Sequence, residues 1–436
     1  MVKYIKSTGS NICNSVKPSH LLSAALLAAT CAGAPAATLC VSQSGSCAYT
    51  TISAAVKAAS AGDTVQVQPG VYSDSIVITK PVSLIGSGRD RTIINAFGLS
   101  NGIYIDGTSK MPDAGISGVV VSGLTVQNAN FEGILVANGT SVIISNNTVA
   151  GNNRGLNTSN STCPGLPAFE TNEGLDCGEG IHLMAVSHSV VANNIVRNNS
   201  GGILITDETG PNHDNLISGN TVSDNPYACG ITMASHPAYT AGGIKSPPGI
   251  YHNTISGNIS RANGLKVDGG AGVGIFAPGP GNQAYGNVVI NNTLTGNGLP
   301  GVTMHNHASF PMAPKVNLND NMIIGNTISG NAADNGDAAT PGPTGINLYS
   351  VAPVTGTVIA QNVISNEQIG VAINIPSGDV RVHLNNLQGS TGVDNLGSGT
   401  VDASQNYWGC AGGPGQSGCG GTIGTVTTGN AGSVPF

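Results

Sequence analysis

The chain has 436 residues, of which 63 are glycine, 8% are charged and 4% are aromatic. Aliphatic residues alternate with polar ones and glycine does not recur at every third position, which excludes a disordered chain and collagen. The net charge is −7 with 15 lysines and arginines. This balance argues against a nucleic-acid partner, because phosphates require a basic stripe.

The N-terminus has the pattern of a secretory signal peptide. Lysines precede an apolar run over Leu21–Ala29, and the small residues of 34–37 follow it. We therefore predict a signal peptide over residues 1–37 and a secreted or periplasmic protein, with a buried helix as the alternative. The apolar run is too short to cross a bilayer and no other stretch is apolar enough, so no membrane span is expected.

A short amphipathic helix is predicted next, within Tyr49–Ala61. Its apolar residues share one face, Thr51 can cap its start and Gly62 can end it. Residues 38–62 are expected to cover the open end of a solenoid. Short strands follow the helix, and the sequence places them at Thr64–Val67, Ile76–Thr79, Val82–Ile85 and Thr92–Ile94.

A repeat then runs along most of the chain, with a period of about 22 residues or slightly more. A glycine followed by an aliphatic residue opens a short strand at Gly133, Gly155, Gly180, Gly202, Gly230, Gly274, Gly301, Gly345 and Gly370. Asparagines recur in step with these glycines, at Asn147, Asn194, Asn220, Asn253, Asn292, Asn326, Asn362 and Asn386. Stacked coils place identical residues over one another, so the asparagines are expected to hydrogen-bond along the axis.

The cysteines predict an oxidising compartment. Cys13 and Cys31 lie in the predicted signal peptide, and Cys229 is expected to be a buried thiol outside any disulfide. The remaining cysteines form three close pairs that would each close a short loop. The predicted disulfides are Cys40–Cys47, Cys163–Cys177 and Cys410–Cys419.

The repeated Asn-Asn-Thr-Val and Gly-Ile-x-Ile patterns resemble those of a known family. So do the opening segments Thr51–Val56, Pro69–Tyr72 and Lys80–Gly86 and the closing Asn406–Cys410. The chain resembles right-handed parallel β-helix repeat proteins of the pectin-lyase-like superfamily, near the periplasmic copper-processing and carbohydrate-binding groups. The resemblance implies an all-β, single-stranded right-handed parallel β-helix over residues 63–436, with an N-terminal capping helix and a C-terminal capping segment.

The resemblance does not imply one reaction, because the superfamily includes lyases, hydrolases, esterases and epimerases. The Gly-His-Gly turn of polygalacturonase-like chains and the Asp-Pro-His motif of alginate-epimerase-like chains are absent from the sequence. A candidate site therefore has to be sought from the residues themselves.

Polar residues suited to catalysis follow the glycine-led strands in one phase of the repeat, which stacking would bring to one side of the solenoid. Carboxylates with imidazoles suit general acid–base catalysis on a sugar, and the same groups suit a divalent metal. The predicted catalytic residues are Asp207, Glu208, His213, His236, His305 and His307. The predicted substrate-binding residues are Glu179, His182, Phe276 and Tyr349. Alternatively, these loop residues are solvated or cap turns.

Two functional classes follow. The first is a secreted protein that binds or processes a polysaccharide or cell-surface glycan, with a hydrolase- or lyase-type site. The second is a non-catalytic cell-envelope or adhesive solenoid, and metal delivery in the periplasm is a third hypothesis. The sequence assigns no specific metal or cofactor. A compact acid–histidine group would favour the first class, and coils without such a group would favour the second.

Overall fold

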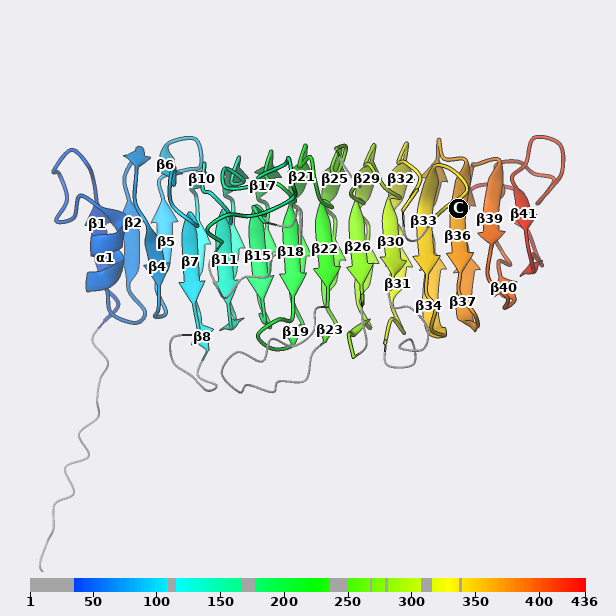
Figure 1. Ribbon diagram of the computed structural model, residues 1–436, viewed down its shortest axis with the longest axis horizontal. Coiled ribbons are helices and arrows are strands. Elements are labelled where there is room, and N and C mark those ends of the chain that lie inside the picture. The colour runs from blue at the N-terminus through cyan, green and yellow to red at the C-terminus, as the bar shows by residue number, and fades with distance from the viewer. Residues whose placement is uncertain are drawn as a thin grey trace, which may run out of the picture. The chain divides into compact units, whose positions relative to one another are not determined.

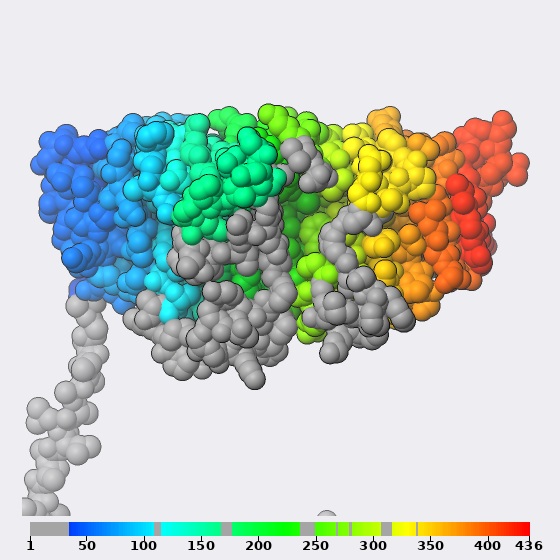
Figure 2. All heavy atoms as spheres, in the orientation of Figure 1, coloured from blue at the N-terminus to red at the C-terminus, as the bar shows by residue number. Residues whose placement is uncertain are grey.

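The computed structural model describes residues 35–108, 115–166, 177–235, 249–266, 269–278, 281–306, 316–336 and 339–436. The predicted signal peptide up to residue 34, and the predicted site residues His236 and His307, lie outside these ranges. Residues 36–436 form one compact unit, which is an elongated solenoid in Figures 1 and 2. Within the described residues, no helix has the length and apolar character needed to cross a membrane.

Three long parallel sheets run along the solenoid, and the chain winds through them coil by coil. A coil contributes a strand first to sheet A, then to sheet B and then to sheet C (Figure 1). Sheet A contains β1 (Thr38–Val41), β2 (Thr64–Val67), β5 (Ser83–Gly86), β9 (Val120–Ser122), β13 (Ile143–Ser145), β16 (Val190–Ala192), β20 (Leu216–Ser218), β24 (Thr254–Ser256), β28 (Val288–Ile290), β31 (Met322–Ile324), β34 (Val354–Ala360), β37 (Gly378–His383), β40 (Val401–Asp402) and β42 (Val426–Thr427). Sheet B contains β3 (Gly70–Tyr72), β6 (Thr92–Asn95), β10 (Thr125–Gln127), β14 (Thr148–Ala150), β17 (Ile195–Arg197), β21 (Thr221–Ser223), β25 (Ile259–Arg261), β29 (Thr293–Thr295), β32 (Thr327–Ser329), β35 (Val363–Ser365) and β38 (Asn386–Leu387).

Sheet C carries the candidate site. It contains β4 (Ile76–Ile78), β7 (Ile103–Asp106), β11 (Ile134–Ala137), β15 (Ile181–Met184), β18 (Ile203–Thr206), β22 (Ile231–Ala234), β26 (Val273–Phe276), β30 (Val302–His305), β33 (Thr344–Tyr349), β36 (Ile369–Asn374), β39 (Thr391–Asn395) and β41 (Gly421–Ile423). Two short sheets lie in the turns between sheets C and A. They are formed by β8 (Ile116–Ser117) with β12 (Gly139–Thr140), and by β19 (Asn212–His213), β23 (Ile250–Tyr251) and β27 (Ala284–Tyr285).

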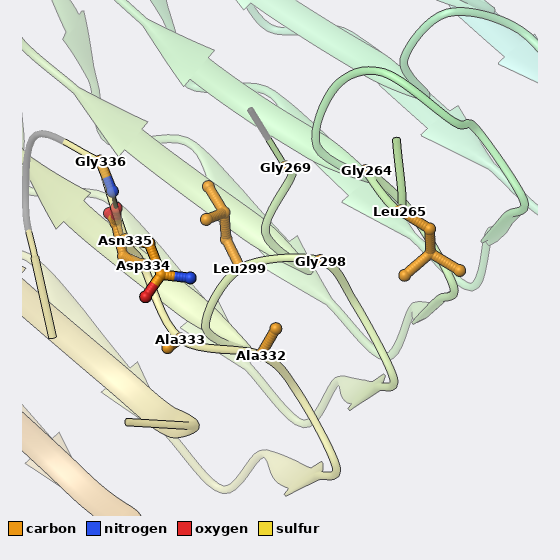
Figure 3. A pocket seen from close by; sticks show the side chains of 10 residues that line it. All are labelled: Gly264, Leu265, Gly269, Gly298, Leu299, Ala332, Ala333, Asp334, Asn335 and Gly336. Atoms are coloured by element: carbon orange, nitrogen blue, oxygen red, sulfur yellow. Dashed lines mark hydrogen bonds between the residues drawn. The ribbon is translucent and has the colours of Figure 1, made fainter. Parts of the chain in front are cut away.

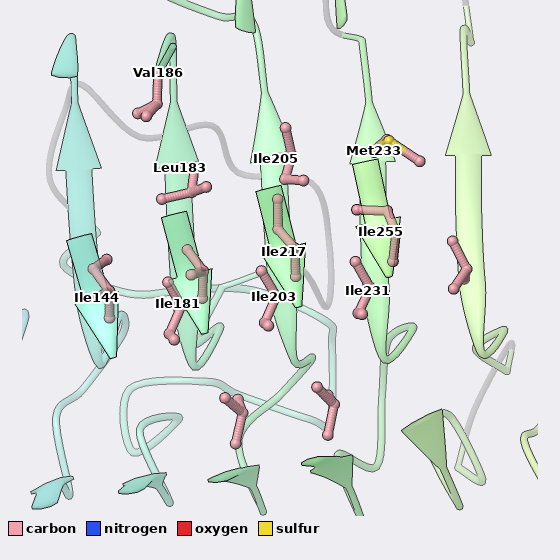
Figure 4. Close-up of a cluster of buried hydrophobic side chains, with 14 of the residues drawn as sticks. Ile144, Ile181, Leu183, Val186, Ile203, Ile205, Ile217, Ile231, Met233 and Ile255 are labelled. Carbon is pink, nitrogen blue, oxygen red and sulfur yellow. The ribbon is translucent and has the colours of Figure 1, made fainter. Parts of the chain in front are cut away.

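Each strand pairs with its counterpart one coil further on, as the repeat predicts. Ile181 of β15 pairs with Ile203 of β18, which in turn pairs with Ile231 of β22. These three side chains are fully buried and stack inside the solenoid, as Figure 4 shows. Burial of one such side chain contributes about 1.5–3 kcal/mol, so a column of aliphatic residues along the axis is the main stabilising feature of the fold.

The helix α1 (Ile52–Ala58) lies beside β1 and β2 at one end of the solenoid (Figure 1). The Thr51 hydroxyl caps it by accepting a hydrogen bond from the amide of Ala54, and the apolar face that includes Ile52 and Val56 is buried. The predicted capping helix is therefore confirmed. The three predicted disulfides are also present. Cys229 is buried outside them, where its Sγ accepts a hydrogen bond from the amide of Ala271.

Asparagine ladders line the turns between the sheets. Along each ladder the side-chain oxygen accepts two hydrogen bonds from the asparagine one coil earlier, as Asn292 Oδ1 does from the amide and Nδ2 of Asn258 at 2.9 and 3.0 Å. The predicted ladder is confirmed, although Asn258 and Asn385 take the places expected for Asn253 and Asn386. Its members are Asn147, Asn194, Asn220, Asn258, Asn292, Asn326, Asn362, Asn385 and Asn406.

The structure contains two further ladders that the single predicted phase missed. One joins Asn215, Asn253, Asn287 and Asn321, and the other joins Asn152, Asn199, Asn225, Asn263, Asn297 and Asn331. The second of these ends on a glutamate, since Glu367 Oε1 accepts from the amide and the Nδ2 of Asn331, both at 2.9 Å.

Two of the predicted strand starts are wrong. Gly155 opens no strand: the neighbour of β11 in sheet C is β15, which begins at Ile181. Leu156 instead packs with Phe131 beside the Cys163–Cys177 disulfide. Gly274 lies inside β26, whose register aligns it with Thr232. The strand therefore begins after Gly272, so the glycine that precedes this strand is Gly272 and not Gly274.

Glu367 makes the stability of the coil pH-dependent. Burial raises the pKa of Glu367 from its ordinary value of 4.5 to about 7, against the lowering effect of the Asn331 hydrogen bonds. Because the folded-state pKa is the higher one, the contribution of Glu367 to stability is fully present below about pH 4.5 and is lost as the pH rises through about 7. Glu367→Gln should therefore gain about 1–3 kcal/mol at pH 8 and little at pH 4, measured by urea unfolding. Equal gains at both pH values would contradict this assignment.

Candidate active site

The outward face of sheet C is unusual because many of its side chains are buried. Along each strand inward aliphatic residues alternate with outward ones, and register places the outward residues in two columns across the sheet. One column runs through Leu135, His182, Leu204, Thr232, Gly274, Thr303 and Asn347, and the other through Ala137, Met184, Thr206, Ala234, Phe276, His305 and Tyr349. Polar side chains on this buried face require partners, and two groups of them stand out.

The first group is centred on His182, which contacts residues of three successive coils. Its Nδ1 lies 3.6 Å from Oε1 of Glu132, and its Nε2 lies 2.9 Å from the Thr206 hydroxyl and 3.9 Å from Oε2 of Glu208. The Thr206 hydroxyl donates to Glu208 at 2.9 Å, so it accepts from His182 and Nε2 carries the proton. His182, Glu132 and Glu208 are only 3%, 2% and 1% exposed. The imidazole is thus enclosed between two carboxylates.

Glu179 adds a third buried glutamate beside this group. It precedes Gly180 as Glu132 precedes Gly133 one coil earlier, so both glutamates stand at the start of a sheet C strand. The carboxylate of Glu179 lies over the next coil, where a Cβ on Gly201 would be 2.2 Å from its Oε2. A side chain at 201 would therefore displace it. We refer to Glu132, Glu179, His182, Thr206 and Glu208 as the acid–histidine cluster.

Asp207, a predicted catalytic residue, lies next to the cluster in sequence but is engaged by the turn that follows β18. Its Oδ2 accepts hydrogen bonds from the Ser235 hydroxyl at 2.9 Å and from the amide of Gly249. Ser235 in turn accepts from the amide of Gln283. The carboxylate therefore connects turns of successive coils, which is the turn-capping role considered as the alternative from sequence.

The second group lies further along the same face, on β26, β30 and β33. Phe276, His305 and Tyr349 follow one another in register, as the sequence predicted for residues of one phase. The rings of Phe276 and His305 are perpendicular, with centroids 4.5 Å apart. Among the described residues, the buried Thr303 Oγ1 and Asn347 Nδ2 in the neighbouring column have no hydrogen-bond partner. This face can therefore offer both ring surface and hydrogen-bonding groups to a ligand.

His213 does not belong to either group. It lies on β19, in the turn between sheets C and A, where its Nδ1 is 2.7 Å from Oδ2 of Asp214. The chain leaves sheet C after Thr206, so His213 stands in the turn that Asp207 begins and not in the outward columns of sheet C that include His305. The catalytic role predicted for His213 stays a prediction. His236 and His307 lie outside the described residues.

An open groove lies on the turns between sheets B and C, outside the acid–histidine cluster. It has a volume of about 780 Å³ and is lined by Leu265, Leu299 and Asp334 from three successive coils (Figure 3). A smaller groove of about 310 Å³ shares Leu265 and includes Lys266. Among the described residues that line the larger groove, Asp334 carries a carboxylate, and its Oδ1 accepts from the amide of Gly336. The described lining therefore offers a surface for binding beside one carboxylate.

The comparisons with known proteins agree with this architecture. A family model for the right-handed β-helix region matches residues 85–245. The Dettilon tailspike protein gp208 has a similar solved structure, with a TM-score of 0.56, 13% identity, and coverage of 86% of this chain and 64% of that one. The catalytic domain of a GH87 alpha-1,3-glucanase in complex with tetrasaccharides gives a TM-score of 0.52 at 14% identity, covering 91% of this chain and 68% of that one. A search of curated protein sequences finds no match.

The chain is therefore a right-handed parallel β-helix protein, as its resemblance to the pectin-lyase-like superfamily predicts. Its structural neighbours include polysaccharide-active enzymes and tailspikes. Identities of this size establish a shared fold, so the reaction must be argued from the side chains.

Three members of the cluster were named from the sequence, Glu208 as catalytic and Glu179 and His182 as substrate-binding, and these roles stay predictions. Glu132 and Thr206 were not named. A signal for Glu132 was available, because the tripeptide Glu-Gly-Ile occurs at both 132–134 and 179–181. Alignment of these two copies places the glutamates one coil apart. Thr206 gave no comparable signal, since threonines are common in the strands.

Proposed function

We propose that this protein is a hydrolase of neutral polysaccharides, with its reaction centre at the acid–histidine cluster. The observation that supports the proposal is His182, enclosed between the carboxylates of Glu132 and Glu208 and joined to Glu208 through the Thr206 hydroxyl. Most glycoside hydrolases use a pair of carboxyl groups as acid and base or nucleophile, and an imidazole between two such groups can transfer protons.

The roles follow from the hydrogen bonds. Glu208 accepts from the Thr206 hydroxyl, so we assign it as the base that deprotonates the attacking water. Glu132, on the Nδ1 side of His182, is assigned as the acid that protonates the leaving glycosidic oxygen. The bond between the anomeric carbon and that oxygen breaks, and the water oxygen bonds to the anomeric carbon. For the return step the imidazole proton moves from Nε2 to Nδ1, Nδ1 gives it to Glu132, and Nε2 takes the proton of Glu208 through the Thr206 hydroxyl, which restores the starting tautomer.

The charge of the cluster favours a neutral glycan over a uronate polymer. A lyase requires a cation to neutralise the uronate carboxylate, whereas the described contacts of His182 are with two glutamates and a threonine. Arg197 and Arg261 end strands β17 and β25 of sheet B rather than lying on sheet C. In the assigned roles Glu208 is ionised, and its negative charge would repel a polyanion.

The second group of sheet C residues suits the binding of further sugar units. The Phe276 and Tyr349 rings are partly exposed on this face, and aromatic rings pack against the apolar faces of sugars. Thr303 Oγ1 and Asn347 Nδ2 could hydrogen-bond sugar hydroxyls. The glucanase neighbour, whose structure contains tetrasaccharides, has the same fold and is consistent with this proposal.

The test is a panel of neutral glucans and uronate polymers incubated with the purified protein, with and without a chelator. Release of reducing ends from a neutral glycan without unsaturated products is the expected result. Unsaturated uronate products would show a lyase and overturn the proposal. Binding of a glycan without cleavage would support the non-catalytic solenoid instead.

A further inference from the structure

A second polar cluster lies on the turns between sheets C and A, separate from the acid–histidine cluster. His188, Asp214 and His252 occupy the same turn position in three successive coils, with φ of 51°, 55° and 55°. The position before it holds His213 and Tyr251, which pair between β19 and β23. Stacked coils thus bring three imidazoles around a single carboxylate.

The distances place this carboxylate between the imidazoles. Oδ2 of Asp214 lies 2.7 Å from Nδ1 of His213 and 3.9 Å from Nε2 of His188. Oδ1 of the same carboxylate faces the other way, 3.8 Å from Nδ1 of His252. Nitrogen or oxygen atoms of His188, His213 and Asp214 all lie within 4.8 Å of one another.

The turn position that holds His188, Asp214 and His252 is left-handed along the solenoid. Other coils place Ser141, Gly286, Asp320 and Gly356 there, and histidine is one of the residues that adopt this conformation. The His188 and His252 side chains are 61% and 59% exposed, so they do not contribute to the core and their nitrogen atoms can reach a ligand from solvent.

We propose that His188, His213 and Asp214 bind a divalent transition-metal ion on the Oδ2 side of the carboxylate. Imidazole and carboxylate donors suit Zn²⁺, Cu²⁺ and Ni²⁺, whose bonds to such ligands are about 2.0–2.2 Å long. An ion between His188 Nε2 and Asp214 Oδ2 spans their 3.9 Å separation with bonds of that length. The ion replaces the hydrogen bond between His213 and Asp214, the rings shift by a few tenths of an ångström, and water completes the coordination.

A sugar-binding role for the same surface is disfavoured by the orientation of its rings. The His213 and Tyr251 rings stack 4.8 Å apart and nearly parallel, and Tyr251 stacks on Tyr285 at 5.2 Å. Both faces of the central Tyr251 ring are therefore occupied by its neighbours, which leaves less ring face in this column for a sugar.

The experiment is titration of the untagged protein with Zn²⁺ by calorimetry, supported by Cu²⁺ electron paramagnetic resonance. His188→Asn and Asp214→Asn keep a residue that tolerates the left-handed turn, and His213→Tyr keeps the stacked column. Each is expected to weaken binding at least tenfold, and the nitrogen splitting of bound Cu²⁺ should lose one nitrogen in His188→Asn and in His213→Tyr.

His252→Asn is the matched control, because it changes the same turn position on the Oδ1 side of the same carboxylate. It is expected to alter the affinity by less than threefold. Absence of Zn²⁺ binding by the unaltered protein would overturn the proposal. So would unchanged binding in the His188 and His213 variants, which would place the ion elsewhere.

Discussion

His182→Gln is expected to lower kcat on the cleaved glycan by roughly 10²- to 10⁴-fold, the range for loss of a positioned proton-transfer group. Glutamine can still hydrogen-bond the Thr206 hydroxyl but cannot carry a proton between Glu132 and Glu208. Steady-state kinetics across pH measure the effect. The loss should fall mainly on kcat, with a smaller change in KM, because the substrate-binding face is left intact.

A structural role for His182 predicts a different result, so stability has to be followed beside activity. Loss of a partner from buried carboxylates is destabilising, and a fall in Tm without a fall in kcat of the folded fraction would contradict the catalytic assignment. His383→Gln is a suitable control. His383 also contacts a carboxylate, with its Nε2 3.0 Å from Oδ2 of Asp402, but on β37 of sheet A.

Glutamine variants of the two flanking glutamates extend this test. Glu132→Gln and Glu208→Gln should each reduce kcat, and the double variant should lose little more than the worse single one, because groups that act as one unit are not additive. Additive losses would indicate that the two carboxylates act independently of His182.

Asn292→Ala is expected to cost about 3–5 kcal/mol of stability, the largest effect predicted for a single ladder residue. The Asn292 side chain donates to the carbonyl of Ile255 at 2.9 Å and accepts two hydrogen bonds from Asn258. Alanine leaves the buried amide of Asn258 without its acceptor and the carbonyl of Ile255 without this donor, at about 1–3 kcal/mol each, while Asn258 Nδ2 keeps its hydrogen bond to the carbonyl of Ile217. Urea unfolding measures the change, and hydrogen exchange should show the loss of protection centred on β24 and β29.

Asn291→Gly provides the matched control for the ladder. Asn291 is the exposed neighbour of Asn292, with φ of 56°, a conformation that glycine adopts without strain. Its replacement should change stability by less than about 0.5 kcal/mol. A similar loss in both variants would mean that the turn backbone, rather than the ladder hydrogen bonds, provides the stabilisation.

Periodic features were predictable from the sequence because a solenoid converts sequence period into spatial stacking. The β-helix, the capping helix, the three disulfides and most members of one ladder follow from local patterns that recur coil after coil. Errors arose where one coil departs from the period. The excursion around Leu156 was counted as a coil, and the strand after Gly272 was placed two residues late.

The candidate site was only partly predictable, for a related reason. Glu179, His182 and Glu208 were found, and Phe276, His305 and Tyr349 share one outward column as expected. The number of residues between Thr206 and His213 did not reveal that His213 lies on a short strand in the turn between sheets C and A. Glu132 was missed because its copy of the repeat lies 47 residues before that of Glu179, across an irregular excursion.

By itself, the sequence determined that the backbone winds into stacked coils, because repeated apolar and asparagine positions can all be satisfied only when equivalent residues lie over one another. Tertiary structure alone decided which polar residues meet. The direction of a side chain in a turn depends on the local backbone, which the repeat period does not specify. Turn geometry therefore decided that Glu132 and Glu208 enclose His182. It also decided that His213 and His188 meet at Asp214.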